Sequence, residues 1–243
     1  MIRLEHVSKR FGSAWVLEDV SLDVPTGSTL GLVGQGGAGK SLILKLICGL
    51  IRPDGGRVTV DDAEVSALSE PALAPVRDRI GMIFQNFALF DALTVAENVG
   101  FPLARRGDLS AAAIAGRVTE RLRQVHLPGI EALLPAELSG GMKKRVCLAR
   151  ATIHDPPILL CDDPTAGLDP VTTNRIFALL SAMQRAQRAT ALIVSHEVDS
   201  LLPLCDALAM LDRGRLIFAG TVAEARACEH PLLREFLDGG AAA

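Results

Sequence analysis

The sequence predicts an α/β fold built on a mostly parallel sheet with helices on both faces. In the second half of the chain, short apolar runs of strand length alternate with longer stretches of helical periodicity. The predicted strands span residues 158–161 and 191–194, and the predicted helices span residues 139–154 and 170–185. Such alternation is typical of parallel sheets whose strands are buried on both faces.

The N-terminal part of the chain adds further predicted strands. Alternating and β-branched residues predict strands over residues 2–7, 16–24, 29–33 and 57–60, and a short apolar strand over residues 80–84. Turns rich in glycine and proline separate them. The sequence therefore places several strands ahead of the regular strand–helix alternation.

The character of the sequence changes after Gln85. Residues 94–101 and 110–127 carry helical periodicity and charge, interrupted by Pro102. Because helical periodicity dominates this region, we expect a helical insertion from about residue 86 to residue 137.

The bulk composition limits the possible functions. The 243 residues suffice for one large domain, and the net charge of −3 gives no basic excess for binding nucleic acid. Although 49% of the residues are hydrophobic, no apolar run approaches the roughly 18 residues that cross a bilayer. The start of the chain lacks a signal-peptide pattern, so we expect a cytosolic protein. The five scattered cysteines are interpreted as buried thiols in a reducing compartment.

Residues 143–145, Lys-Lys-Arg, form the densest basic run of the chain. We interpret this run as the solvated face of a helix, and a contact with a partner or a nucleotide is the alternative. Both interpretations place it on the helix predicted over residues 139–154.

A glycine-rich loop follows the strand predicted over residues 29–33. It reads Gly-Gln-Gly-Gly-Ala-Gly-Lys-Ser from Gly34 to Ser41, and an apolar helical stretch follows it. Glycines let successive backbone N–H groups converge on phosphate oxygens at a helix N-terminus. Lys40 can then reach the β- and γ-phosphates, and the Ser41 hydroxyl can ligate Mg²⁺. The loop therefore predicts binding of a nucleoside triphosphate.

Two acidic residues follow the strand predicted over residues 158–161. A buried strand that delivers a carboxylate beside a phosphate loop provides a second contact to Mg²⁺, and Asp162 is the candidate for this role. Asp163 lies where a base can orient the attacking water. A solvated acidic turn is the alternative.

Ser139, Gly140 and Gly141 open a predicted helix and form a second candidate anion site. Serine is a favoured N-cap, and the glycines expose backbone N–H groups at the positive end of the helix dipole. A plain helix cap is the alternative. As a γ-phosphate site it requires a second copy of the chain, which predicts a head-to-tail dimer with ATP between the copies.

Two polar residues, Gln85 and His196, follow predicted strands. At the carboxyl end of a strand such residues can reach toward a ligand crevice. His196 can donate to a γ-phosphate there. For both residues a structural role is the alternative.

Together these residues resemble the ATP-binding subunits of ABC transporters over nearly the whole chain. The resemblance implies a RecA-like parallel core at residues 1–85 and 156–220, with an antiparallel β subdomain and a helical subdomain at about residues 86–155. It implies a single ATP-binding domain over residues 1–238. Residues 221–243 would form a helical tail whose last residues are frayed.

The resemblance also assigns the nucleotide site. The residues expected to bind ATP are Phe11, Gly34, Gln35, Gly36, Gly37, Ala38, Gly39, Lys40, Ser41, Leu42, Ser139, Gly140, Gly141 and Asp169. Those expected to hold Mg²⁺ are Ser41, Gln85 and Asp162, and the expected catalytic residues are Asp163, His196, Gln85 and Lys40. Phe11 would stack on adenine, with Trp15 as the alternative.

Such subunits close in pairs on two ATP molecules and drive a membrane permease. The resemblance therefore implies that the chain lies on the cytoplasmic face of the inner membrane, attached through a permease that docks on the helical insertion. A narrower resemblance, to Mla-type lipid-transport ATPases linked to MCE-domain proteins, rests on residues 87–103, Met142 and residues 230–239. It implies phospholipid trafficking between bacterial membranes, with an MCE-domain lipid-binding protein as a further partner.

The chain departs from the family pattern at three positions. Asp163 stands where glutamate is usual, Leu42 replaces a hydroxyl residue, and Gly36 replaces a serine. The shorter Asp163 carboxylate predicts slow or partner-dependent hydrolysis, because a base must lie within hydrogen-bonding reach of its proton. Leu42 predicts weaker ATP binding, and Gly36 a looser loop.

Two other functions remain open on the sequence. One is a soluble ABC ATPase outside transport, such as a scaffold component in iron–sulfur assembly. The other is a subunit that senses ATP and scarcely hydrolyses it, for which Asp163 and Leu42 argue.

Overall fold

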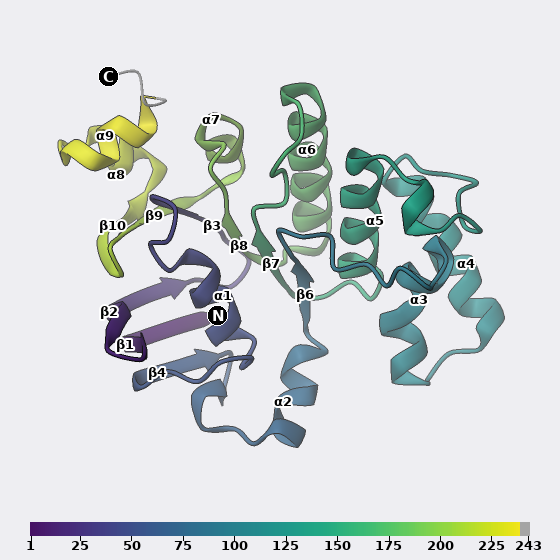
Figure 1. Ribbon diagram of the computed structural model, residues 1–243, viewed down its shortest axis with the longest axis horizontal. Coiled ribbons are helices and arrows are strands. Elements are labelled where there is room, and N and C mark those ends of the chain that lie inside the picture. The colour runs from purple at the N-terminus through teal and green to yellow at the C-terminus, as the bar shows by residue number, and fades with distance from the viewer. Residues whose placement is uncertain (239–243) are drawn as a thin grey trace.

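The computed structural model describes residues 1–238 and contains two β-sheets with helices between and around them (Figure 1). The larger sheet has six strands in the order β10-β9-β3-β8-β7-β6. Its strands are β3 (Thr29–Val33), β6 (Ile80–Ile83), β7 (Ile158–Asp162), β8 (Thr190–Val194), β9 (Ala207–Asp212) and β10 (Arg215–Thr221). All neighbours pair in parallel except β9 and β10, which are antiparallel. The predicted parallel core is thus confirmed.

The smaller sheet is antiparallel and has the strand order β2-β1-β4-β5. Its strands are β1 (Ile2–Phe11), β2 (Ala14–Val24), β4 (Gly55–Val60) and β5 (Ala63–Glu64). It forms the antiparallel β subdomain that the resemblance implied.

Nine α-helices lie within the described residues. They are α1 (Lys40–Ile47), α2 (Glu70–Arg77), α3 (Val95–Arg106), α4 (Ala111–Gln124), α5 (Gly140–Thr152), α6 (Pro170–Gln187), α7 (Val198–Leu201), α8 (Val222–Ala227) and α9 (Pro231–Leu237). Short 3₁₀ helices occupy Val65–Ala67, Pro135–Glu137 and Leu202–Leu204. Among residues 1–238, no helix has the length and apolar character needed to cross a membrane.

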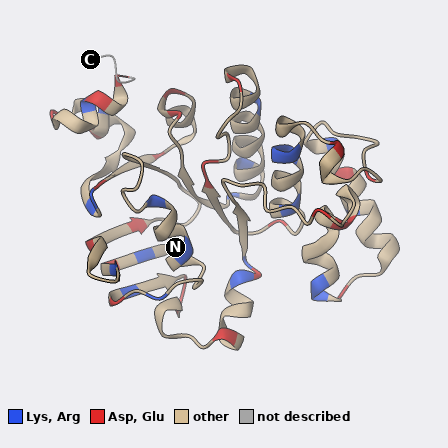
Figure 2. Ribbon diagram, in the orientation of Figure 1, with Lys and Arg blue, Asp and Glu red and all other residues tan. Residues whose placement is uncertain are grey.

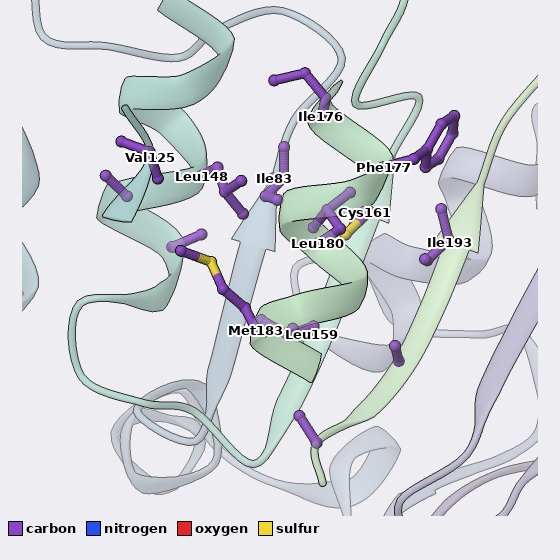
Figure 3. Packing of buried hydrophobic residues seen from close by; sticks show 14 of the residues in the cluster. Ile83, Val125, Leu148, Leu159, Cys161, Ile176, Phe177, Leu180, Met183 and Ile193 are labelled. Carbon is purple, nitrogen blue, oxygen red and sulfur yellow. The ribbon is translucent and has the colours of Figure 1, made fainter. Parts of the chain in front are cut away.

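Two apolar clusters form the core, one on each face of the large sheet. Along β7, Ile158 and Leu160 belong to the cluster shared with α1 and the small sheet, whereas Leu159 and Cys161 belong to the cluster shared with α3, α5 and α6. Successive side chains of a strand point to opposite faces, so a strand covered on both faces must be apolar throughout. Figure 3 shows Leu180 of α6 packed over Cys161 of β7.

The helical insertion is present, with α3 and α4 packed together and α3 also packed against α5. The predicted interruption at Pro102 is wrong, because α3 continues through this proline to Arg106. Val99 and Leu103 are buried on the inner face, and this packing holds the helix together across the proline. The helix ends at Gly107 (φ 71°), whose N–H donates to the Leu103 carbonyl.

The C-terminal segment contains more regular structure than the sequence predicted. Strands β9 and β10 were not predicted, and helices α8 and α9 follow them within the segment predicted as a helical tail. Outside this segment, helix α2 was not predicted either. The predicted fraying of the last residues, 239–243, lies outside the described residues.

Candidate nucleotide-binding site

A cavity of about 320 Å³ opens where several parallel strands of the large sheet end. Parallel strands present their carboxyl ends at one edge, so residues that follow different strands meet there. The lining residues are Gly36, Gly37, Ala38, Gly39, Lys40, Ser41, Leu42, Gln85, Asp162, Asp163, Val194 and His196. The fold thus gathers the phosphate loop, both aspartates and both strand-end residues around one space.

The glycine-rich loop begins and ends at positions that only glycine can occupy. Gly34 has φ 140°, and a Cβ there would lie 2.0 Å from the Leu211 carbonyl oxygen. Gly39 has φ 104°, and its Cβ would lie 2.6 Å from Cδ2 of Leu17. A Cβ on Gly36 would meet open space. The loop is therefore fixed by close packing at its two ends and is sterically free at Gly36.

Lys40 folds back over this loop and organises it. Its Nζ donates to the carbonyl oxygens of Gly34 at 2.6 Å and Gln35 at 2.8 Å, and the residue is buried. Burial lowers the pKa of the Lys40 ammonium, and the charges of Asp163 and Asp162 oppose this shift. The cavity thus holds a buried cation of the kind that binds phosphate.

Ser41 and Asp162 lie together although they are 121 residues apart in sequence. The Ser41 Oγ donates to Oδ1 of Asp162 at 2.7 Å. Hydroxyl and carboxylate oxygens are the ligand types that Mg²⁺ prefers. This pair of donors, at the edge of a phosphate cavity, fits a magnesium ion.

Asp163 is buried and held in an unusual backbone conformation, with φ 46°. Its N–H donates to the Val194 carbonyl at 2.9 Å, and its Oδ2 lies 3.9 Å from Nε2 of His196. Burial raises the pKa of the Asp163 carboxyl, while His196 and Lys144 oppose the shift. A carboxylate with a raised pKa beside a histidine is typical of a site of proton chemistry.

The interpretation of residues 143–145 as a solvated helix face is wrong. Lys144 is only 2% exposed, and its Nζ donates to the carbonyl oxygens of Gln85 at 2.7 Å and Asp163 at 3.4 Å. Arg145 is half-buried and donates to the His126 carbonyl at 3.0 Å. Three consecutive helical residues point in directions about 100° apart, so they cannot share one face. Lys144 and Val194 were not among the predicted site residues, and no motif marks either of them.

Ser139, Gly140 and Gly141 do not line the cavity of their own chain. Ser139 is exposed and caps α5, its Oγ accepting the Met142 N–H at 3.3 Å. Asp169 is also exposed and caps α6, accepting the Thr172 N–H at 3.0 Å. Both predicted ATP contacts therefore lie at exposed helix starts outside this cavity.

The two aromatic candidates for adenine stacking lie on the β1–β2 hairpin, and neither lines the cavity. Phe11 is 53% exposed and Trp15 is 49% exposed. The Lys9 Nζ lies 5.6 Å from the Phe11 ring centroid, and the Arg10 guanidinium lies 5.7 Å from that of Trp15. Both rings remain accessible to a base, and the geometry does not choose between them.

Comparison with known proteins agrees with this architecture. A family model described as ABC transporter matches residues 17–166. The chain is 41% identical to a methionine import ATP-binding protein of Pseudomonas putida, over 98% of this chain and 72% of the relative. It is 43% identical to the corresponding protein of Caulobacter vibrioides, over 92% of this chain and 68% of the relative.

Solved structures show the same fold. The dimeric bacterial ABC transporter cassette MJ0796 superposes with a TM-score of 0.85 at 32% identity, covering 91% of this chain and 99% of that chain. A dimeric post-hydrolysis state of the same cassette, bound to ADP and phosphate, gives a TM-score of 0.85 at 31% identity, with the same coverage.

The prediction of lipid trafficking is wrong, because these relatives are methionine import proteins. The comparisons likewise do not support the narrower Mla-type resemblance or the predicted MCE-domain partner. The segments that carried this resemblance serve the fold: the buried Asn98 side chain bonds the Phe90 backbone, and Leu233 of α9 is fully buried. Residues fixed by packing carry no information about the transported substrate.

The comparisons confirm the predicted cassette fold and the prediction of an ABC ATPase. Relatives and solved structures of the same kind cover more than nine-tenths of the chain. The chain therefore belongs to the ABC transporter family and is an ATP-binding cassette that hydrolyses ATP.

Proposed function

We propose that this chain is the ATP-hydrolysing subunit of an ABC importer and that the imported substrate is methionine or a similar amino acid. One observation carries the proposal: a single cavity joins the phosphate loop to Asp162, Asp163 and His196. The printed function of the relatives, methionine import, supports the choice of substrate. It also argues against the alternative of an ABC ATPase outside transport.

In this proposal the loop N–H groups and Lys40 bind the phosphates of ATP. Ser41, Asp162 and the Gln85 side chain would hold Mg²⁺, which would neutralise phosphate charge. The hydrogen bond between Ser41 and Asp162 supports the first two assignments. Leu42, which lines the cavity with an apolar side chain, supplies no hydroxyl to the phosphates.

Asp163 is proposed to accept a proton from the attacking water, and His196 to donate to the γ-phosphate. The separation of 3.9 Å between Oδ2 of Asp163 and Nε2 of His196 leaves both groups free to contact a ligand between them. Phe11 or Trp15 would cover the adenine. These assignments follow from the position of each group at the cavity or on the adjacent hairpin.

The proposed active form is a head-to-tail dimer. The exposed Ser139–Gly141 end of α5 would bind the γ-phosphate held by a second copy, with Asp169 beside it. A Cβ on Gly141 would lie 3.1 Å from Cγ2 of Thr172, which shows how closely the starts of α5 and α6 approach. The dimeric form of the similar cassette MJ0796 supports this arrangement.

The permease is proposed to dock in a second cavity, of about 480 Å³, beside the helical insertion. The rings of Phe90 and Phe101 lie 4.8 Å apart at this cavity, and each residue is at least 40% exposed. Exposed aromatic residues next to basic ones suit a protein partner. Through this partner the chain would be held at the cytoplasmic face of the inner membrane.

We further propose the domain organisation that the resemblance implied. Residues 1–238 form one cassette, with its core at 1–85 and 156–220 and a helical subdomain at about 86–155. The packing of α3 against α4 and α5 supports this division. Within the described residues, the proposed tail from residue 221 contains α8 and α9.

The proposal is tested by methionine uptake into right-side-out membrane vesicles that contain the chain with its permease, so that the cassette faces the lumen. Radiolabelled methionine is supplied on the face that binds substrate, and ATP with Mg²⁺ is supplied to the cassette. We expect uptake with the parent and none with Lys40→Met, whose membrane content is matched by immunoblot. Methionine transport equal in both preparations, with ATP hydrolysis lost only in the variant, would exclude this function.

A further inference from the structure

Lys144 of α5 carries a buried ammonium group that contacts two separate segments of the nucleotide site. The residue is 2% exposed and is among the largest fully buried side chains of the described chain. Its Nζ donates to the carbonyl of Gln85, at the end of β6, and to the carbonyl of Asp163, just after β7. Lys144 thus joins a helix to the ends of two strands.

Stability alone does not explain a charge at this position. Burying an ammonium removes its hydration, and only a paired or well-bonded group recovers that loss. Among residues 1–238 Lys144 forms no ion pair within 4.0 Å; its hydrogen-bond acceptors are backbone carbonyls, and its Nζ lies 5.3 Å from the ring centroid of Phe87. Methionine has a similar shape and would fill the space without the desolvation cost. The retained charge therefore points to a role at the site.

Both residues that Lys144 holds present side chains to the phosphate cavity. Asp163 has φ 46°, a conformation that a non-glycine residue keeps only when its surroundings fix it. Its N–H is fixed by the Val194 carbonyl at 2.9 Å, and its carbonyl by Lys144 at 3.4 Å. The two contacts together set the direction of the Asp163 carboxylate.

The same face of α5 holds the segment that follows Gln85. Cys147 donates its thiol hydrogen to the Phe87 carbonyl at 2.8 Å, and Arg150 donates to the Ala88 carbonyl at 2.6 Å. Positions 144, 147 and 150 repeat every three residues, so they share one helical face. Figure 2 shows basic residues along this helix. Side-chain hydrogen bonds therefore tie this loop to α5.

At its other end, α5 begins beside the exposed Ser139. We propose that Lys144 is a positioning residue that couples this end of α5 to Gln85 and Asp163 of the same chain. Contact between the Ser139 end and the ATP of a second copy would then adjust the hydrolytic groups of the first. This inference rests on the proposed function, which assigns Gln85 and Asp163 to hydrolysis and Ser139 to the second copy.

The test compares ATP hydrolysis and ATP affinity in four forms of the full-length chain. Lys144→Met removes both hydrogen bonds and keeps the side-chain volume, whereas Lys144→Arg keeps a cationic donor. Lys45→Met, on an exposed turn of α1, is the control for loss of a lysine charge. Phosphate release is measured against ATP concentration, and the Kd for ATP by calorimetry in the presence of Mg²⁺.

We expect Lys144→Met to lower kcat by about tenfold or more, the scale of a small misplacement of a reacting group. The Kd for ATP should stay within about twofold of the parent, and the Hill coefficient should fall toward one. Lys144→Arg should recover part of kcat and cooperativity, and Lys45→Met should match the parent. If Lys144→Met does not fold, Lys144→Gln is used, with the same expected loss of kcat and cooperativity.

A kcat within about twofold of the parent in the folded Met or Gln variant would overturn the inference. So would a parallel loss of kcat, affinity and melting temperature that Lys144→Arg does not reverse, because that pattern indicates a structural role. Asp163→Asn is measured in the same assay. If it hydrolyses ATP as fast as the parent, the proposed role of Asp163 fails instead, whatever Lys144→Met does.

Discussion

Asp163 combines a left-handed backbone conformation with a side chain that is shorter than the glutamate usual at this position. Its φ of 46° lies in the left-handed region, which aspartate adopts more readily than glutamate. Aspartate therefore suits this turn, and its carboxylate is one methylene shorter than that of the usual glutamate. Slow hydrolysis stays a prediction, which rests on the shorter carboxylate.

We expect Asp163→Glu to raise kcat by about threefold to tenfold, because the longer side chain carries the base nearer to the attacking water. The left-handed backbone should make the variant less stable by about 1 kcal/mol. Phosphate release and thermal unfolding measure the two effects. Asp163→Asn is the control without a base and should be nearly inactive. An unchanged kcat in the glutamate variant would show that carboxylate reach does not limit the rate.

His154 provides a test of pH dependence. Burial lowers its pKa to about 4, with Arg106 adding to the shift, Asp78 and Asp155 opposing it, and Arg121 adding slightly. Both ring nitrogens are buried without a hydrogen-bond partner in the described part of the chain. The folded state is therefore the poorer proton acceptor, and His154 opposes folding once the unfolded histidine is protonated.

The pKa of His154 in the folded chain lies below its ordinary value. Between pH 6.5 and about 4, His154 therefore binds more protons in the unfolded chain than in the folded chain. The contribution of His154 to stability is complete above pH 6.5 and is lost as the pH falls toward 4. We expect the unfolding free energy of the parent, relative to His154→Leu, to decrease over this window. Urea unfolding at several pH values measures this difference. A difference that is constant from pH 7.5 to 4.5 would contradict the burial of a neutral imidazole.

At the scale of elements, the phosphate loop depends on where it touches its neighbours. Strand β2 packs tightly against Gly39. A Cβ on Gly39 would lie 2.6 Å from Cδ2 of Leu17 and 3.0 Å from the Val16 carbonyl oxygen. Gly36 lies in the same loop with open space around it. The two glycines therefore make a matched pair for substitution.

We expect Gly39→Ala to weaken ATP binding by at least about tenfold and to destabilise the chain, because alanine clashes with β2 and is strained at φ 104°. Gly36→Ala should bind ATP about as tightly as the parent, because its Cβ meets nothing within 4 Å, and should be slightly more stable, because alanine restricts the unfolded chain. Calorimetry with ATP and thermal unfolding provide both measurements. Equal affinities in the two variants would mean that contact with β2 does not shape the loop.

At the scale of the whole molecule, the predicted nucleotide contacts of one chain lie in two separate places. The cavity holds the phosphate loop and Asp163, while Ser139 lies exposed at the start of α5. In the proposed dimer a second copy would complete the site, and the similar cassette MJ0796 is dimeric. The exposed helix start should therefore control association and leave ATP binding by one chain unaffected.

We expect Ser139→Asp to abolish the dimer that forms with ATP, because its carboxylate repels the γ-phosphate of the second copy. Aspartate is also a good N-cap, so α5 should remain intact. Ser110→Asp, at the exposed start of α4, is the control and should leave dimerisation unchanged. Light scattering with ATP in an Asp163→Asn background measures the dimer. Dimers of equal abundance in both variants would exclude Ser139 from the interface.

The fold was predictable where local sequence determines structure. Strands β3, β7 and β8 lie within one residue of their predicted bounds, because each is a continuous apolar run between polar turns. Strand β9 was not predicted. It pairs with β3, far away in sequence, and Leu208 and Leu211 are fully buried only through that long-range contact. A short apolar run without a distinctive turn does not reveal such a partner.

The sequence by itself determined the chemistry of this protein. The contiguous residues from Gly34 to Ser41 specify a phosphate loop through short-range backbone geometry, and Asp162 and Asp163 follow a strand that is apolar throughout. The tertiary structure decided which side chains from distant parts of the chain contact one another at the site. Packing turned Lys144 inward from a run of three basic residues and placed it on Gln85 and Asp163. The burial of a side chain depends on the elements that pack around it, and these come from distant parts of the chain.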